Sequence, residues 1–434
     1  MKNKHLIVVS VDALVFEDLE YAKSLPMFGK ILKEGSLVKR VTTIYPSLTH
    51  PVHASIMSGC PAGETGIVAN LHFMPGQSSV PWYNYLSDMK CDTIFHAAHR
   101  AGLTTASCRW PLTGKGNDVI DYLLPEIMNT DVAGYEDHIL DAYRNMGTSE
   151  CLMDLIEEGV KRFGCYNEHP AYDAFGTFCA AEIIRRYKPN VLFTHPGFVD
   201  AERHRTGLFS DRMKESLVTT DRWISALWDA VIDAGIENET DLIVLSDHGH
   251  LSYSRSISPN IYLKDAGFIR VDEEGKMLDW DAYAAAGGLS SLVYLSRPED
   301  TALYNSVYSL LRKMAEEGIY GFEQVFTREE VKEKYGLYGA FSFVLETDGC
   351  TGFGEYLTRP VVRPAVNEDV RLGHSSHGHL PEKGPQPTFL AMGPSIEKGV
   401  EVEHGHILDH AATFAKILGI PFPQAHGKAA CFVK

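Results

Sequence analysis

The chain has 434 residues, of which 44% are hydrophobic and 22% charged, and its formal net charge is −17. This length allows two or three average domains, or one large α/β enzyme with a substantial core. The acidic balance argues against binding to a nucleic-acid polymer, which needs lysine and arginine to displace counterions. A small phosphorylated substrate stays compatible with it if metal ions supply the local positive charge.

Eight cysteines are scattered along the chain without CxxC pairs, a pattern typical of free thiols in a reducing compartment. The first apolar run is interrupted by Asp12 and is shorter than a signal peptide requires. No run approaches the roughly 18 apolar residues of a membrane span. We therefore expect a cytoplasmic protein with no membrane association. Homo-oligomerisation is compatible with the sequence.

Short β-branched runs alternate with amphipathic stretches along the chain. This alternation predicts an α/β fold with a mainly parallel central sheet flanked by helices. The expected strands are residues 5–11, 37–43, 104–107, 191–194, 242–246 and 388–392. The expected helices are residues 19–33, 51–57, 91–100, 174–187, 212–234 and 407–418.

The pattern changes between residues 252 and 370, where short strands and one helical segment suggest a smaller α+β unit. We interpret this unit as an insertion that forms a cap or pocket wall over a core made of residues 1–251 and 371–434. A second irregular stretch, residues 113–147, is rich in acids, Asn and Gly. It is expected to loop over the surface.

Carboxylates and imidazoles follow several of the expected strands. They are Asp12, Asp200 with His204, Asp247 with His248, and His377 in the stretch GHSSHGH, where His374 is the competing candidate. Ligands of parallel sheets bind at the carboxyl ends of the strands. Aspartate oxygen and imidazole nitrogen suit zinc, with manganese or iron as alternatives. The pattern therefore predicts a binuclear metal site, whereas any single pair alone could be a surface salt bridge.

The segment TTIYPSLTHPVHASIMSG offers several hydroxyl nucleophiles: Thr42, Thr43, Ser47, Thr49 and Ser55. Thr49 stands just before His50-Pro51, and proline favours the first turn of a helix. A helix N-terminus favours a bound anion, and a metal there would activate the hydroxyl. The alternative interpretation of Thr49 is an ordinary helix N-cap.

Taken together, these motifs resemble the alkaline phosphatase superfamily, and most closely its nucleotide pyrophosphatase/phosphodiesterase branch. The matching segments are VVSVDAL, PSLTHP followed by His53, SGCP, GIVAN ending at Asn70, Trp110-Pro111, Asp200–His204, Asp247-His248-Gly249 and His377-Gly378. The resemblance covers about residues 1–250 and 370–434. The intervening segment matches only in position and length.

The resemblance implies two zinc ions and a phosphothreonine intermediate. One ion would be held by Asp200, His204 and His377, and the other by Asp12, Thr49, Asp247 and His248. Thr49 would attack phosphorus, and water would then hydrolyse the phosphothreonine. Asn70 matches the family asparagine that donates to a phosphoryl oxygen.

Several positions depart from the branch pattern. His50 and His195 replace two aromatic residues that clamp the nucleobase in nucleotide-cleaving members, so weaker base stacking is expected. His50, His195, Trp110 and Lys115 are the candidate substrate contacts.

Three functions follow from these features. The first is a zinc-dependent hydrolase of phosphoric diesters or pyrophosphates. The second is a phosphonoacetate-hydrolase-like enzyme, in which Lys115 would meet the substrate carboxylate. The third, from another class, is a non-catalytic metal-binding protein, although metal storage would need neither Thr49 nor Asn70. A phosphomonoesterase would need an arginine for the extra negative charge of its substrate, and none is evident in this sequence. The sulfatase signature is also absent.

Overall fold

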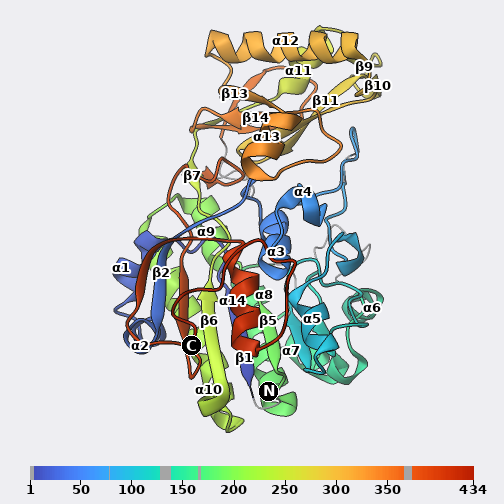
Figure 1. The fold of residues 1–434 in the computed structure, drawn as a ribbon. Helices are drawn as coiled ribbons and strands as arrows, with labels where there is room; N and C mark the ends of the chain where they lie inside the picture. Colours follow the sequence, from blue (N-terminus) through green and yellow to red (C-terminus); the bar gives the residue numbers. More distant parts are fainter. Residues whose placement is uncertain (1–3, 78, 128–137, 165–167, 366–373) are drawn as a thin grey trace.

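The computed structural model describes residues 4–77, 79–127, 138–164, 168–365 and 374–434 (Figure 1). Its larger part is built on an eight-stranded sheet with the order β19-β2-β18-β6-β1-β5-β3-β4. The strands of this sheet are β1 (His5–Ser10), β2 (Ser36–Thr42), β3 (Thr105–Cys108), β4 (Tyr122–Leu124), β5 (Val191–Thr194), β6 (Thr240–Leu245), β18 (Phe389–Met392) and β19 (Glu401–His406). The predicted α/β class with a mainly parallel sheet is confirmed.

Strand β18 is the one reversed strand of this sheet, since only its pairings with β2 and β6 are antiparallel. The carboxyl ends of the other strands therefore share one edge. Because β18 runs the opposite way, the segment that precedes it arrives at that same edge. This topology brings the histidine-rich stretch before β18 next to the residues that follow β1, β5 and β6.

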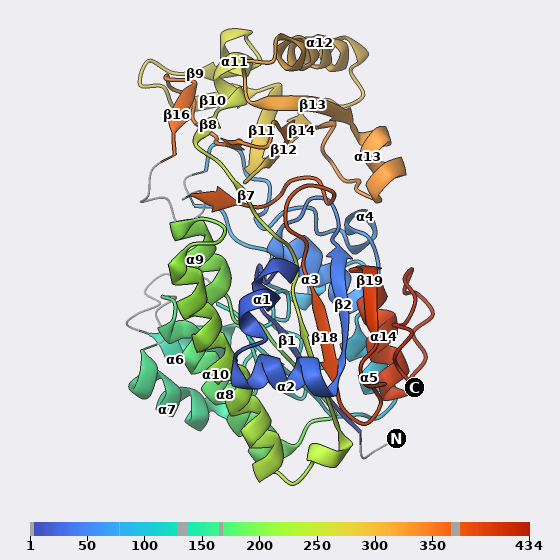
Figure 2. The ribbon, with the colours of Figure 1, turned by 90° about the vertical axis from the view of Figure 1, so that its left-hand side faces the viewer.

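Helices cover both faces of the sheet (Figure 2). Leu6 and Val8 of β1 belong to one apolar core, and Ile7 and Val9 to the other, as the alternation of a strand requires. Fully burying each such side chain contributes about 1.5–3 kcal/mol. The helices of this larger part are α1 (Leu19–Ala22), α2 (Pro26–Glu34), α3 (Thr49–Ser58), α4 (Ala62–Thr65), α5 (Ile94–Arg100), α6 (Ile139–Asn145), α7 (Met153–Phe163), α8 (Ala171–Tyr187), α9 (Phe198–Thr206), α10 (Asp211–Asp233) and α14 (Asp409–Leu418).

A smaller unit lies beyond the carboxyl edge of the large sheet, at the top of Figure 1. It has an apolar core of its own, drawn from residues between Ile257 and Val361. Its sheets have the orders β11-β12-β14-β13, β15-β8-β16 and β10-β9. Its elements are β8 (Arg255–Ile257), α11 (Pro259–Asp265), β9 (Ile269–Val271), β10 (Met277–Trp280), β11 (Ala282–Gly287), β12 (Ser290–Leu295), α12 (Thr301–Glu317), β13 (Phe322–Thr327), α13 (Arg328–Tyr335), β14 (Phe343–Thr347), β15 (Thr351–Phe353) and β16 (Val362–Pro364).

Two connections tie this unit to the larger part. Strand β7 (Leu251–Ser252) pairs with β17 (Ser375–Ser376), so the chain enters and leaves the unit side by side. Glu346 of β14 is fully buried and accepts hydrogen bonds from the Tyr45 hydroxyl at 2.9 Å and the Lys383 ammonium at 2.8 Å. Burial raises the pKa of Glu346 to about 7, although Lys383 opposes the shift.

Two sequence expectations were wrong in detail, and one strand was missed. The helix expected over residues 19–33 is interrupted, because Pro26 opens α2 and cannot continue the preceding helix. The described parts of residues 113–147 are not only a surface loop, since they contain the buried edge strand β4 and α6, while residues 128–137 lie outside the described ranges. Strand β19 was missed because its sequence EVEHGH belongs to a half-exposed edge and lacks an apolar pattern.

None of the helices within the described ranges is both long and apolar enough to cross a membrane.

Glu346→Gln should change the pH dependence of stability. Since the carboxyl pKa is raised in the folded protein, its protonated form stabilises the fold below about pH 4.5, and this contribution is lost as the pH rises through about 7. Relative to the variant, the wild type should lose up to about 3 kcal/mol of unfolding free energy across that range. Urea unfolding at several pH values measures the difference. Parallel pH profiles would contradict the assignment.

Candidate active site

The predicted metal ligands come together at the carboxyl edge of the large sheet. Asp12 follows β1, Asp247 and His248 follow β6, and Asp200 and His204 lie in α9 after β5. His377 reaches this edge from the segment before the reversed strand β18. These are turns and helix starts just beyond strand ends, where parallel sheets place their ligands.

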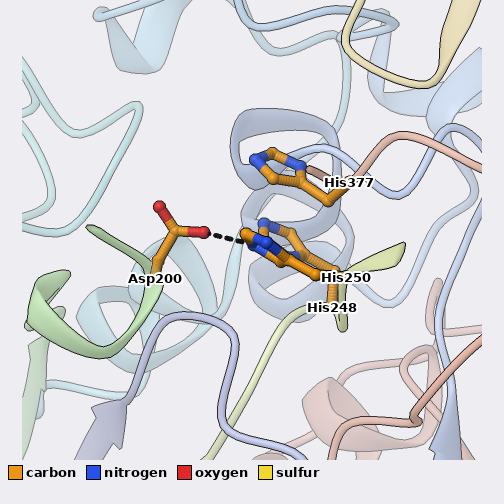
Figure 3. A group of neighbouring side chains, drawn as sticks. All are labelled: Asp200, His248, His250 and His377. Atoms are coloured by element: carbon orange, nitrogen blue, oxygen red, sulfur yellow. Dashed lines mark hydrogen bonds and ion pairs between the residues drawn. The ribbon is translucent and has the colours of Figure 1, made fainter. Parts of the chain in front are cut away.

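One group of donor atoms centres on Asp200. The ligand atoms of Asp200, His248, His250 and His377 lie within 4.8 Å of one another (Figure 3). His204 is also close, with its Nε2 atom 3.4 Å from Oδ2 of Asp200.

The tautomers of two of these histidines follow from their backbone contacts. Nδ1 of His204 donates to the Ser375 carbonyl at 2.7 Å, and Nδ1 of His377 donates to the Ser47 carbonyl at 3.0 Å. A carbonyl can only accept, so the hydrogen is on Nδ1 in both rings. Each Nε2 atom therefore keeps a lone pair that can bind a metal.

His250 was not predicted as a site residue. The Ser375 hydroxyl donates to the Arg203 carbonyl, so it can only accept from Nδ1 of His250, 3.0 Å away. The lone pair on Nε2 of His250 then faces Oδ1 of Asp200 at 2.7 Å. A cation shared by the two atoms would satisfy this contact. The signal in the sequence was the second histidine of the motif DHGH, two residues after His248.

A second group of donor atoms consists of Asp12, Asp247 and His248, again within 4.8 Å of one another. Nε2 of His248 lies 3.4 Å from Oδ1 of Asp12 and 3.3 Å from Oδ2 of Asp247. These two carboxylate oxygens are buried and accept no hydrogen bond from the part of the chain that the structure describes. Buried acceptors without donors are costly, and a divalent cation is a natural partner for them.

The pKa shifts of the site residues also fit a bound cation. Burial raises the pKa of Asp12 well above its usual value, and the nearby Asp200 and Asp247 carboxylates add to the rise. Burial lowers the pKa of His377 to about 4 and that of His248 well below its usual value. Neutral imidazoles and crowded carboxylates are the donor set of a zinc-type centre, so these residues fit the metal ions that the sequence predicts.

Thr49 lies at the start of α3, next to the second group. Its Oγ1 atom is 3.3 Å from Nε2 of His248. The N-cap position is taken by Leu48, and no side chain caps the helix, so the N-cap interpretation of Thr49 is wrong. The hydroxyl is directed at the donor cluster and lies where backbone N–H groups favour an anion.

Asn70 faces the same helix terminus. The backbone N–H of His50 donates to Oδ1 of Asn70 at 3.0 Å. With its oxygen held in this way, the side chain presents its NH₂ group as a donor.

His195 and His53 contact residues of the site and of the strand that precedes it. His195 is buried, with Nδ1 donating to the Ser10 carbonyl and Nε2 lying 3.3 Å from Oδ2 of Asp12. Nδ1 of His53 donates to the Thr49 carbonyl at 2.7 Å, while its Nε2 atom contacts the Ser10 hydroxyl at 3.0 Å. His195 therefore positions Asp12, and its predicted role as a substrate contact does not match its surroundings.

The other predicted substrate contacts are also placed differently from expectation. The Trp110 side chain is fully buried, with its ring 4.8 Å from that of His53. Lys115 lies over the Tyr85 ring and lines a cavity with none of the candidate metal ligands. His50 is buried, its ring 4.9 Å from that of Trp82 and its Nε2 atom 3.9 Å from Oε2 of Glu126.

Two arginines near the site, Arg109 and Arg203, are buried. Arg109 donates to the Tyr172 carbonyl at 2.7 Å and pairs with Asp173 at 3.5 Å. Arg203 pairs with Asp18 at 2.6 Å. Sequence neighbours could not reveal these partners, because they come from distant elements.

The smaller unit contacts the site through the turn between β11 and β12. The backbone N–H of Leu289 donates to the His377 carbonyl at 2.9 Å. Gly288 has a φ of +68°, and a Cβ atom there would lie 2.4 Å from the same carbonyl oxygen. The turn can therefore approach His377 so closely only with glycine at this position. His374, the competing ligand candidate, is exposed.

A family model described as type I phosphodiesterase/nucleotide pyrophosphatase matches residues 6–348. The chain belongs to this family. Membership supports phosphodiester or pyrophosphate hydrolysis as the reaction class, and the nucleotide pyrophosphatase branch expected from the sequence is confirmed.

The curated proteins to which this chain is similar share little sequence identity with it. Ectonucleotide pyrophosphatase/phosphodiesterase family member 1 from Mus musculus is 24% identical over 257 residues, which cover 57% of this chain and 24% of that protein. The chain thus matches about a quarter of the length of this relative. Family member 7 from Mus musculus is 21% identical over 442 residues, covering 96% of this chain and 83% of that protein.

Solved structures show the same fold. Murine ectonucleotide pyrophosphatase/phosphodiesterase 5 superposes with a TM-score of 0.67 at 19% identity, covering 98% of both chains. An inactive threonine-to-alanine form of that protein in complex with AMP gives a TM-score of 0.66 at 19% identity, covering 98% of this chain and 97% of that one.

His250→Ala should weaken metal binding at the group around Asp200. Removing a histidine beside a metal site typically lowers affinity by about 10–100-fold. Chelator competition with zinc measures this change independently of activity. His374→Ala is the matched control, because His374 is exposed, and it should bind zinc as the wild type does. Equal zinc affinity for His250→Ala and the wild type would contradict a role for His250.

Proposed function

We propose that this protein hydrolyses phosphoric diesters or pyrophosphates, with Thr49 as the nucleophile at a binuclear metal centre. The observation that carries the proposal is the position of the Thr49 hydroxyl. It lies at a helix N-terminus, 3.3 Å from His248, which belongs to both groups of donor atoms. A metal-storage protein would need no hydroxyl there.

Zinc is the metal that we propose, with manganese or iron as alternatives. Asp200, His204 and His377 would hold one ion, with His250 beside them. Asp12, Thr49, Asp247 and His248 would hold the other. When bound, the two ions would supply Lewis acidity that favours the ionised threonine hydroxyl and stabilises charge on phosphoryl oxygens.

Different groups of the chain carry out the steps of the proposed reaction. The Thr49 oxygen forms a bond to phosphorus as the bond from phosphorus to the leaving-group oxygen breaks, giving a phosphothreonine. Water then attacks phosphorus, the bond between phosphorus and the Thr49 oxygen breaks, and the phosphorylated product leaves as the Thr49 hydroxyl is regenerated. The backbone N–H groups at the start of α3 and the Asn70 amide donate to phosphoryl oxygens, a contribution worth about 3–4 kcal/mol per donor in comparable oxyanion sites.

Charges around the site favour diesters over the phosphonoacetate alternative. A substrate carboxylate would need a cation, and Lys115 is directed to a separate cavity. Arg109 is engaged by Asp173. Glu126 instead places a carboxylate 3.9 Å from His50. The carboxylate of phosphonoacetate would be repelled there.

The AMP complex of the murine neighbour supports nucleotide diesters and pyrophosphates as the first substrates to examine. Buried His50 offers no open aromatic face for a base, so we expect weak discrimination among nucleobases. The remaining parts of the proposal are a cytoplasmic location and a small phosphorylated substrate without a nucleic-acid polymer or a membrane as partner.

Thr49→Ala should abolish most of the turnover while leaving the metal content intact. Loss of a nucleophile lowers the rate by at least roughly 100-fold, and zinc analysis beside hydrolysis of a chromogenic phosphodiester measures both quantities. Thr49→Ser keeps a hydroxyl and should retain much of the activity. Ser55→Ala, which removes another hydroxyl of α3, should behave as the wild type does. Undiminished turnover in Thr49→Ala would exclude this nucleophile.

A substrate panel separates the reaction classes. Zinc-loaded protein should cleave a phosphodiester and a dinucleotide pyrophosphate faster than a monoester, and should release little phosphate from phosphonoacetate. Faster release from phosphonoacetate than from any ester would instead support carbon–phosphorus bond cleavage. A protein that binds zinc and cleaves nothing in the panel would favour the non-catalytic alternative.

A further inference from the structure

A third cluster of metal-type donors lies at the opposite end of the helix that carries Thr49. Cys60 follows the last turn of α3, Glu64 lies in α4, and His426 comes from the C-terminal segment after α14. One ligand atom from each of these residues lies within 4.8 Å of the other two. Nε2 of His426 is 2.9 Å from Oε2 of Glu64.

Cys91 lies beside Cys60, outside this group of three donor atoms. Its thiol shares a hydrogen bond with that of Cys60, which lowers the pKa of Cys91 and raises the pKa of Cys60. No disulfide joins the two sulfurs in the structure.

The backbone holds the four residues in place. The N–H of His426 donates to the Gly59 carbonyl at 2.9 Å, and the Gln424 amide donates to the Asp92 carbonyl at 2.6 Å. Gly59 has a φ of +69°, and a Cβ atom there would lie 2.6 Å from the Ala425 Cβ. The C-terminal segment is thus packed tightly on the turn that presents Cys60, before any metal is considered.

We propose that Cys60, Glu64, Cys91 and His426 bind a zinc ion, separate from the catalytic centre. Two sulfurs, one imidazole and one carboxylate match the ligands of structural zinc sites, whose bonds are about 2.0–2.3 Å long. Ligands around one such ion lie within about 4 Å of each other. The donor atoms of Cys60, Glu64 and His426 lie within 4.8 Å of one another, and Cys91, beside Cys60, is the fourth ligand that we propose. Magnesium and calcium prefer all-oxygen donors, so a thiophilic cation is the class that fits.

The proposed ion has a structural role. Helix α3 has ten residues and is therefore about 15 Å long, which separates this cluster from Thr49. An ion there would cross-link the C-terminal segment to the ends of α3 and α4 and to the chain before α5. It would fix the far end of the nucleophile helix without touching a substrate.

Cobalt substitution tests the proposal without any activity assay. The donors at the catalytic centre are carboxylates, imidazoles and a hydroxyl, so thiolate-to-cobalt charge-transfer absorption reports only on the Cys60 cluster. Reduced full-length protein loaded with Co²⁺ should show this absorption. Cys60→Ser and Cys91→Ser should lose it, together with one bound zinc per chain, while Cys431→Ser, which removes an exposed thiol, should keep both.

Two results would overturn the proposal. One is a folded, reduced wild type that shows no thiolate absorption with Co²⁺. The other is a purified protein in which the Cys60 and Cys91 thiols react with a thiol reagent only after reduction, and in which no cobalt absorption appears afterwards. That result would make Cys60 and Cys91 a redox pair. Because the wild type alone decides both results, a variant that fails to fold leaves the test intact. The proposed phosphodiesterase activity can fail or hold independently of either result.

Discussion

Mutual repulsion among Asp12, Asp200 and Asp247 is the constraint on which the rest of the site depends. These carboxylates are buried or nearly so, and in low dielectric their charges cannot be held together without cations. Burial lowers the pKa of His248, His250 and His377, so these rings favour the neutral form over the charged one. Divalent ions would resolve the repulsion. The Nδ1 hydrogen bonds of His204, His250 and His377 leave the Nε2 atoms of these rings free to bind them.

The topology of the sheet makes this crowding possible. Parallel strands deliver Asp12 and Asp247 to one edge, and the single reversed strand, β18, returns the chain there with His377. The β11–β12 turn of the smaller unit then donates a hydrogen bond to the His377 backbone. Glu346, Tyr45 and Lys383 join the same two parts nearby. The histidine is thus positioned by both parts of the protein, which couples the geometry of the site to the seating of the smaller unit.

Much of the site could be predicted because its residues follow strands. The runs ending near Asp12, Asp200 and Asp247 are apolar and β-branched, and parallel topology brings their ends together whatever the loops do. The environment of a side chain was harder to predict. Trp110 was expected to contact the substrate, but it is buried against Phe193. The partners of Arg109 and Arg203, Asp173 and Asp18, also come from distant segments. His250 escaped notice because its contact with Asp200 depends on the position of α9.

The most direct test of the binuclear centre is anomalous X-ray diffraction at the zinc edge from crystals of zinc-loaded protein. Two peaks are predicted at the carboxyl edge of the large sheet, one among Asp200, His204 and His377 and the other among Asp12, Asp247 and His248. Zinc found elsewhere, with neither of these positions occupied, would contradict the account.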